Sequence, residues 1–114
     1  MKLHYSELDK GIRFIRLVGK LDAAGVKEIE VEFTGYCAGE AIRILVDLSE
    51  VDGLAVDGIR FLTLTAKSLA GRGGRMALLS PTTGVQAALE KAGIPSIIPT
   101  YSYHESAETV LLAT

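Results

Sequence analysis

The sequence has little of what marks membrane, secreted or nucleic-acid-binding proteins. No apolar run approaches the roughly 18 to 20 residues of a membrane-spanning helix, and Met1–Tyr5 contain no apolar stretch with a cleavage site. Twelve basic and fourteen acidic residues give a net charge of −2 without a basic stripe, which argues against nucleic acid as a partner. The single cysteine, Cys37, can form neither an internal disulfide nor a metal cluster. These absences predict a small, soluble protein of the reducing cytoplasm.

What the sequence does contain is an alternation of strand and helix patterns. Strands are predicted at residues 5–8, 12–18, 42–48, 75–79 and 97–98. The turn signal Asp9-Lys10-Gly11 makes the first two an antiparallel hairpin. Residues 42–48 are almost continuously branched and apolar, as in a strand covered on both faces. The pattern predicts an α/β fold: a mixed, mostly parallel sheet of four to five strands with helices packed on it.

Four helices are predicted from apolar residues at helical spacing and from capping residues before them. The predicted N-terminal caps are Asp22, Asp57, Thr83 with Gln86, and Ser102 with Glu105, and the predicted stops are Gly35, Gly71 and Gly93. In mostly parallel sheets, binding sites gather where strands lead into helices. The loop at residues 51–58 is therefore the first place to look for function.

Four stretches resemble the STAS domain family, in the family's own order. They are Gly19–Ala24, Ile44–Val51, Arg72–Leu79 and Leu89–Ile94. The first is similar to the family's G-x-L-D stretch before a helix, and the second to its central strand, apolar residues followed by D-L-S-x-V. The resemblance covers nearly all of the chain, and it implies one STAS domain over residues 1–114, in the branch of bacterial anti-sigma factor antagonists.

In that branch the loop after the central strand reads about D-S-S-G-[LI], and its second serine is phosphorylated by the partner anti-sigma factor, which is itself a kinase. The unphosphorylated form binds this partner and frees the sigma factor. The aligned residues here are Ala55-Val56-Asp57-Gly58-Ile59. Glycine and isoleucine match, but Asp57 stands at the phosphoserine position. The resemblance therefore implies a partner-binding module that lacks the switch at this position.

Asp57 has two compatible interpretations. It is either an ordinary helix N-cap, worth about 1 kcal/mol over alanine, or a permanent negative charge that keeps the module in one charge state and selects its partner surface. A helix N-terminus favours an anion in both cases. Aspartate supplies −1 on a short arm, whereas phosphoserine brings about −1.5 to −2 and three acceptor oxygens.

The predicted partner-binding surface combines two loops. It comprises Asp22, Ala24, Leu54, Ala55, Val56, Asp57, Gly58, Ile59 and Arg60. The apolar run Leu54-Ala55-Val56 lies where a loop usually carries small polar residues. Either this run is an exposed docking patch beside a charge, or Leu54 and Val56 pack beneath the sheet edge as part of the core.

Two functions follow from these expectations. The first is a binding protein, not an enzyme, that docks an anti-sigma factor or serine-kinase-type regulator and that can associate with other STAS domains. The second is a non-switching scaffold subunit of a signalling assembly or of a lipid-transport ABC system, which the missing serine favours. Neither function requires a cofactor or a metal.

Other motifs have simpler interpretations. The glycine-rich segment at residues 71–74 follows a helix and lacks the lysine and hydroxyl of a P-loop, so it predicts a helix stop and a turn, with nucleotide binding as a weak alternative. His4 and His104 lack metal-ligand spacing. Thr63, Thr65 and Ser68 are alternative phosphorylation sites, but hydroxyls inside a helix usually bond back to the backbone.

Overall fold

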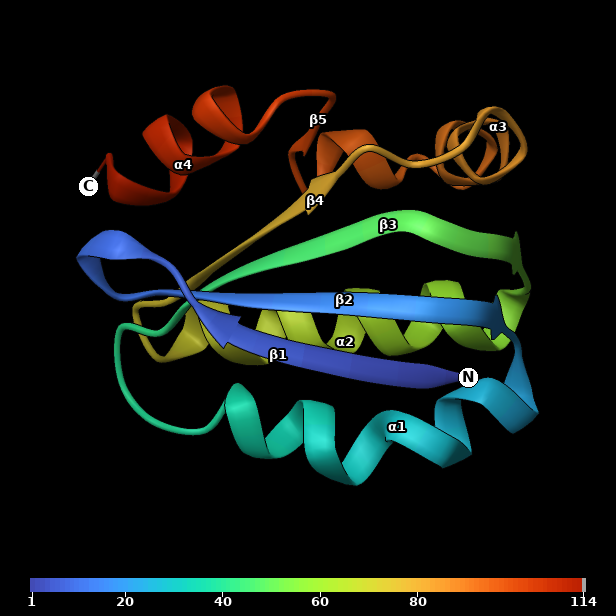
Figure 1. Cartoon of the computed structure of the whole chain (residues 1–114), viewed down its shortest axis with the longest axis horizontal. Helices are drawn as coiled ribbons and strands as arrows, with labels where there is room; N and C mark the ends of the chain where they lie inside the picture. The colour runs from blue at the N-terminus through green and yellow to red at the C-terminus, as the bar shows by residue number, and fades with distance from the viewer. Residues whose placement is uncertain (114) are drawn as a thin grey trace.

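The computed structural model describes residues 1–113 and contains one five-stranded sheet in the order β1-β2-β3-β4-β5. The strands are β1 (Lys2–Glu7), β2 (Ile12–Leu21), β3 (Arg43–Leu54), β4 (Arg75–Leu79) and β5 (Thr100–Tyr101). Strand β1 is antiparallel to β2, and the other neighbours are parallel (Figure 1). The predicted fold class, an α/β protein with a mixed and mostly parallel sheet, is confirmed.

Helices cover both faces of this sheet, unequally. They are α1 (Ala23–Tyr36), α2 (Val56–Gly71), α3 (Thr83–Lys91) and α4 (His104–Leu112), with 3-10 turns η1 (Asp9–Gly11) and η2 (Ile94–Ser96). Helices α1, α2 and α3 pack against one face, whereas α4 lies on the other. Among residues 1–113, no helix has the length and apolar character to cross a membrane.

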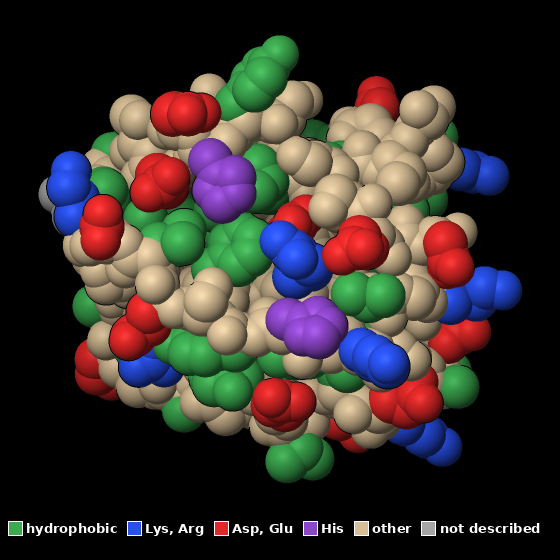
Figure 2. All heavy atoms as spheres, viewed as in Figure 1, with side chains coloured by type: hydrophobic (Ala, Val, Ile, Leu, Met, Phe, Trp, Pro, Cys, Tyr) green, Lys and Arg blue, Asp and Glu red, His purple; other side chains and the backbone are tan. Residues whose placement is uncertain are grey.

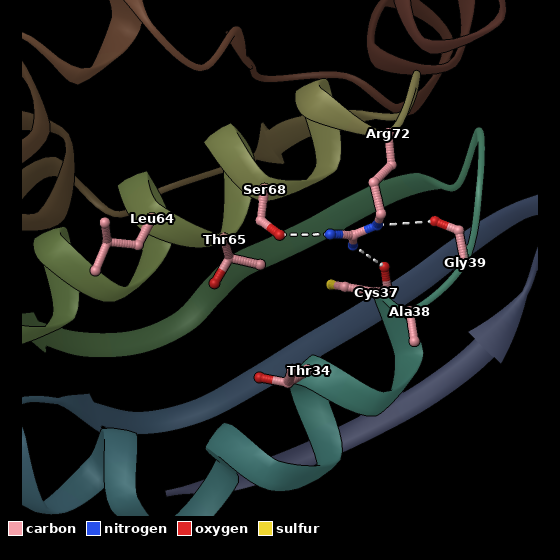
Figure 3. Close-up of a pocket in the computed structure, with 8 residues that line it drawn as sticks. All are labelled: Thr34, Cys37, Ala38, Gly39, Leu64, Thr65, Ser68 and Arg72. Carbon is pink, nitrogen blue, oxygen red and sulfur yellow. Dashed lines mark hydrogen bonds between the residues drawn. The ribbon is translucent and has the colours of Figure 1, made fainter.

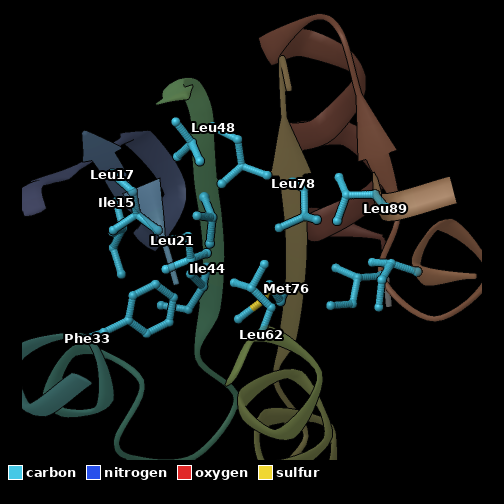
Figure 4. Close-up of a cluster of buried hydrophobic side chains, with 14 of the residues drawn as sticks. Ile15, Leu17, Leu21, Phe33, Ile44, Leu48, Leu62, Met76, Leu78 and Leu89 are labelled. Carbon is cyan, nitrogen blue, oxygen red and sulfur yellow. The ribbon is translucent and has the colours of Figure 1, made fainter. Parts of the chain in front are cut away.

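Each face of the sheet carries its own apolar core. The larger core includes Phe33, Ile44, Leu62, Leu78 and Leu89, between the sheet and the first three helices (Figure 4). The smaller core lies beneath α4, and its buried members are Ile12, Phe14, Leu45, Ala77, Leu79, Ala107 and Leu111. Because side chains alternate along a strand, β3 sends apolar residues to both cores. This is the reason for its almost continuous apolar sequence.

Several predicted boundaries were wrong. The stretch 97–98 is not a strand, because Ile97 and Ile98 donate backbone hydrogen bonds to Ile94 and so continue the turn of η2; the last strand begins only at Thr100. Left-handed Gly93 and the proline in η2 favour this turn over an extended chain. The first strand occupies Lys2–Glu7, not residues 5–8.

Two predicted helix caps were also misplaced. The cap of α3 is Thr82, whose Oγ1 accepts from the Val85 N–H at 3.4 Å, not the adjacent Thr83. Two neighbouring threonines are equivalent to a sequence pattern, so only the backbone path selects one. For α4, Tyr103 occupies the N-cap position without a side-chain hydrogen bond, and the predicted capping box of Ser102 with Glu105 is not formed.

An irregularity in β3 explains the acid of the D-L-S motif. Between the register pairs Arg16–Asp47 and Val18–Glu50, β3 has one residue more than β2. Such an extra residue leaves a backbone group without a ladder partner. Asp47 is only 6% exposed; its Oδ1 accepts from the Ser49 N–H at 2.9 Å, and its Oδ2 lies 3.3 Å from the Arg16 Nε. The motif's aspartate therefore stabilises the strand.

Replacing Asp47 tests this structural role. Asp47→Ala is expected to lower the free energy of unfolding by about 1–2 kcal/mol, since the part-buried hydrogen bond from Ser49 and the contact with Arg16 are both lost. Asp47→Asn is expected to lower it less, because an amide oxygen still accepts from Ser49. Urea denaturation of both variants measures the difference. Wild-type stability in Asp47→Ala would show that the carboxylate does not hold the irregular strand.

Candidate functional site

The predicted site residues meet at the rim where β2 and β3 end. Leu21 and Leu54 are partners in the parallel pairing of these strands. Each is followed directly by the N-cap of a helix, Asp22 for α1 and Ala55 for α2. Helices α1 and α2 therefore start at the same level and run side by side (Figure 1). We call Asp22, Ala24 and residues 54–60 the rim site.

At the start of α1, the prediction for Asp22 is confirmed. Its Oδ1 accepts a hydrogen bond from the Gly25 N–H at 2.8 Å, and the residue is half-buried. This bond satisfies one of the N–H groups that a helix leaves unpaired at its first turn. Ala24, in the same turn, is exposed. Asp22 therefore shapes the rim, and Ala24 contributes surface to it.

At the start of α2, the interpretation of Asp57 as the helix cap was wrong. The helix begins at Val56, because the Ala55 N–H donates to the Leu21 carbonyl at 3.0 Å and the Ala55 carbonyl accepts from the Ile59 N–H. No side chain caps this end. Asp57 is the second residue of the helix, and it is exposed. Its carboxylate stands free in the first turn, where the helix dipole favours negative charge.

The apolar run before Asp57 divides between the core and the surface. Leu54 is half-buried and packs against the larger core, so the core interpretation is correct for this residue. Val56 is 69% exposed, and Ala55 is exposed beside it. The docking-patch interpretation therefore fits Ala55 and Val56. Ile59 is half-buried, and Arg60 points a charge outward from an exposed position.

Two glycines allow both helices to approach the end of β2. A Cβ on Gly25 would lie 2.1 Å from the Lys20 carbonyl oxygen, and one on Gly58 would lie 2.3 Å from that of Leu21. These distances are far below van der Waals contact, and a backbone carbonyl cannot swing aside as a side chain does. Gly58, which matches the glycine of the family's loop, therefore has a packing role at the rim.

Gly58→Ala is expected to destabilise the protein by about 1–3 kcal/mol through overpacking and to displace the first turn of α2. Gly35→Ala is the control, since a Cβ there meets nothing within 4 Å. Gly35 is the second-last residue of α1, so this change should alter stability by less than about 0.5 kcal/mol. Thermal denaturation compares the two. Equal stability of both variants would contradict the close approach at Leu21.

A groove between α1 and α2 extends from the rim, and the sequence did not reveal it. At the rim end it encloses about 340 Å³. Its lining residues there are Ala23, Val26, Lys27, Glu30, Asp57, Arg60, Phe61 and Leu64. Lys27 and Glu30 are both exposed residues of α1. The helical spacing was visible in the sequence, but only the packing of α1 beside α2 shows that both stripes face one cavity.

The far end of the groove is closed by Arg72 (Figure 3). This cavity of about 380 Å³ is lined by Thr34, Cys37, Ala38, Gly39, Leu64, Thr65, Ser68 and Arg72. The Arg72 guanidinium donates to the carbonyls of Cys37 and Gly39, at 2.7 and 2.9 Å, and to the Ser68 hydroxyl. It thereby satisfies carbonyls after α1, and it engages one of the alternative phosphorylation sites.

The remaining alternatives have structural explanations. The Thr63 and Thr65 hydroxyls donate to the carbonyls of Ile59 and Phe61, each at 2.8 Å, as expected inside a helix. The glycine-rich segment ends α2 and turns at Gly73, whose φ is +76°. This is the predicted helix stop and turn. Burial raises the pKa of Cys37 to about 11, so its thiol stays protonated near neutral pH.

Charged side chains of both signs are interspersed on the sheet face shown in Figure 2. Arg16 lies 3.3 Å from the Asp47 carboxylate and 3.8 Å from that of Glu50. His104 stacks on Phe14, with ring centres 5.4 Å apart. Within residues 1–113, no three histidine, cysteine or acidic side chains are grouped so as to hold a metal ion.

Comparison with known proteins agrees with this architecture. Residues 6–107 match the model of the STAS domain. BtrV of Bordetella bronchiseptica, named as an anti-sigma factor antagonist, is 28% identical over 107 residues, which are 94% of this chain and 91% of BtrV. An anti-sigma factor antagonist from Mycobacterium paratuberculosis has a TM-score of 0.87 at 19% identity, covering 98% of this chain and 94% of its own. The anti-sigma factor antagonist SpoIIAA in its unphosphorylated form has a TM-score of 0.78 at 18% identity, covering 99% of this chain and 99% of its own.

Proposed function

Because this chain belongs to the STAS domain family, we propose that it is an anti-sigma factor antagonist-like binding module and not an enzyme. Residues 1–114 then form one STAS domain, which works in the cytoplasm by docking its rim site onto a partner. That partner is an anti-sigma factor or a regulator of the serine-kinase type. BtrV, the sequence relative named as an antagonist, supports this proposal.

One observation carries the proposal: an exposed apolar side chain and a free carboxylate lie next to each other at the first turn of α2. Val56 is 69% exposed although the core is close by, and Ala24 and Ala55 extend its apolar surface. Interfaces between proteins combine an apolar centre with a polar rim, and their charges orient the partner. Val56 supplies the first element and Asp57 the second.

The position of Asp57 also defines how this module differs from its branch of the family. Its side chain is a carboxylate and has no hydroxyl that a kinase can modify. We therefore propose that Asp57 holds the rim site in one charge state. Docking is then governed by the presence of the partner and not by phosphorylation at this position.

The scaffold function is the second candidate, and Asp57 is the observation that favours it. A fixed subunit of a signalling assembly or of a lipid-transport ABC system needs no switch at its rim. The two candidates differ in the complex that they form. A reversible complex with one regulator supports the antagonist function, whereas a permanent assembly of high mass, measured by light scattering on the natively purified protein, supports the scaffold.

Substitution at Val56 tests the rim site. Val56→Asp is expected to weaken binding of the cognate anti-sigma factor at least tenfold, about 1.4 kcal/mol, because a charge replaces the apolar centre. Ile97→Asp is the matched control, since Ile97 is 51% exposed after η2, outside the rim site. Isothermal titration calorimetry compares both with wild type. Equal affinities of the two variants would exclude the rim as the docking surface.

Substitution at Asp57 tests the missing switch. Asp57→Ser is expected to keep the fold, since the side chain is exposed and makes no capping bond, and to become a substrate of the cognate kinase. The added phosphate should then reduce binding to that partner. Mass spectrometry detects the modification, and wild type is the unmodified control. A serine variant that no cognate kinase modifies would contradict an inherited switch position.

A further inference from the structure

The groove between α1 and α2 is one continuous surface that runs the length of both helices. Leu64 lines the cavity at the rim end and the cavity at the far end, and so joins them. The lining residues run from Ala23, at the start of α1, to Gly39 beyond its end, and from Asp57 of α2 to Arg72, its C-cap. At 1.5 Å per residue the helical part of each wall is about 20 Å long. We call this surface the helix groove.

An exposed apolar side chain lies halfway along the helix groove. Leu64 is 60% exposed and lines both cavities. It lies eight residues after Val56, the first residue of α2. Val26 of α1 and Phe61 of α2 line the cavity at the rim end beside it, so both walls are partly apolar there.

Two cations line the groove one turn closer to the rim. Lys27 and Arg60 each lie four residues after the start of their helices, and neither takes part in an ion pair within residues 1–113. The acids of the same cavity, Asp57 and Glu30, lie one and seven residues after the starts, hence about 9 Å apart along the helices. The two cations of this cavity therefore lie at one height along the helices, whereas its two acids lie at different heights.

The shape of the helix groove excludes the same groove of a second copy of this chain as its occupant. Its deeper wall includes Phe61, which meets Phe33 edge to face with ring centres 5.1 Å apart. A symmetric pair places the same surface on both partners. Two hollows placed against each other leave a void, which proteins do not tolerate in an interface core. The occupant has to be convex, and an α-helix of about four turns matches the length.

We propose that the helix groove binds an amphipathic helix of a protein partner, with an acidic residue near Lys27 and Arg60 and a large apolar residue, one turn away, against Leu64. For the kind of partner, a regulator protein, the inference rests on the proposed function. The groove adds a recognition element that the rim site lacks: a charge and an apolar anchor at a fixed separation of about 6 Å.

A synthetic peptide tests the groove without the regulator, so that the two proposals can fail separately. The probe is an alanine-rich helical peptide of about 16 residues, with a central glutamate and a leucine four residues to either side, so that either orientation meets the requirement. Its counterpart carries lysine in place of glutamate. In titrations of isotope-labelled protein followed by nuclear magnetic resonance, the glutamate peptide should bind at least tenfold more tightly and shift amides of residues 27–31 and 60–64.

Variants then test the assignment of charges. The double variant Lys27→Glu with Arg60→Glu should reverse the preference, so that the lysine peptide binds more tightly. Lys91→Glu, in the last turn of α3 and outside the groove, should leave it unchanged. Leu64→Asp should weaken both peptides. Equal affinity of the two peptides for wild type, binding of neither, or amide shifts outside the groove would each overturn the proposal, whatever the regulator does at the rim.

Discussion

The site depends on the parallel pairing of β2 with β3 and on the absence of a loop after either strand. Leu21 and Leu54 are register partners, and each helix begins two residues after its strand ends. This constraint places two helix N-termini at one level of the rim. Both helices approach the end of β2 so closely that Gly25 and Gly58 are required, because the carbonyls of Lys20 and Leu21 occupy the space of a side chain. The rim site and the helix groove are both consequences of this packing.

The N-termini of α1 and α2 are capped differently, and the difference bears on the proposed function. The Asp22 carboxylate accepts a hydrogen bond from a backbone N–H of α1, so it stabilises the fold. Helix α2 has no side-chain cap, and its only early acid, Asp57, extends into solvent. The same residue type is thus structural in one turn and free for recognition in the next. A carboxylate at this position suits a surface that a partner binds without phosphorylating it.

Two residues of the family's motifs also have structural roles in this fold. Asp47 belongs to the D-L-S motif, yet it binds a spare backbone N–H of an irregular strand and the Arg16 guanidinium. Gly58 belongs to the loop motif, yet its role is to admit a carbonyl of β2. Both residues are explained by the fold alone. The fold does not explain Val56 and Asp57, and these are the residues that we propose for partner choice.

The sequence by itself determined the fold class, the order of most elements and the cap at Asp22, because these follow from local periodicity and from hydrogen bonds three residues apart. It also predicted that Asp22 and residues 54–60 lie where strands lead into helices, and they do. Tertiary structure alone decided that α2 starts at Val56, through the bond from Ala55 to Leu21, thirty-four positions earlier. It alone decided that Lys27 of α1 and Arg60 of α2 line one cavity, because such neighbours depend on how two helices align, and no local pattern encodes that alignment.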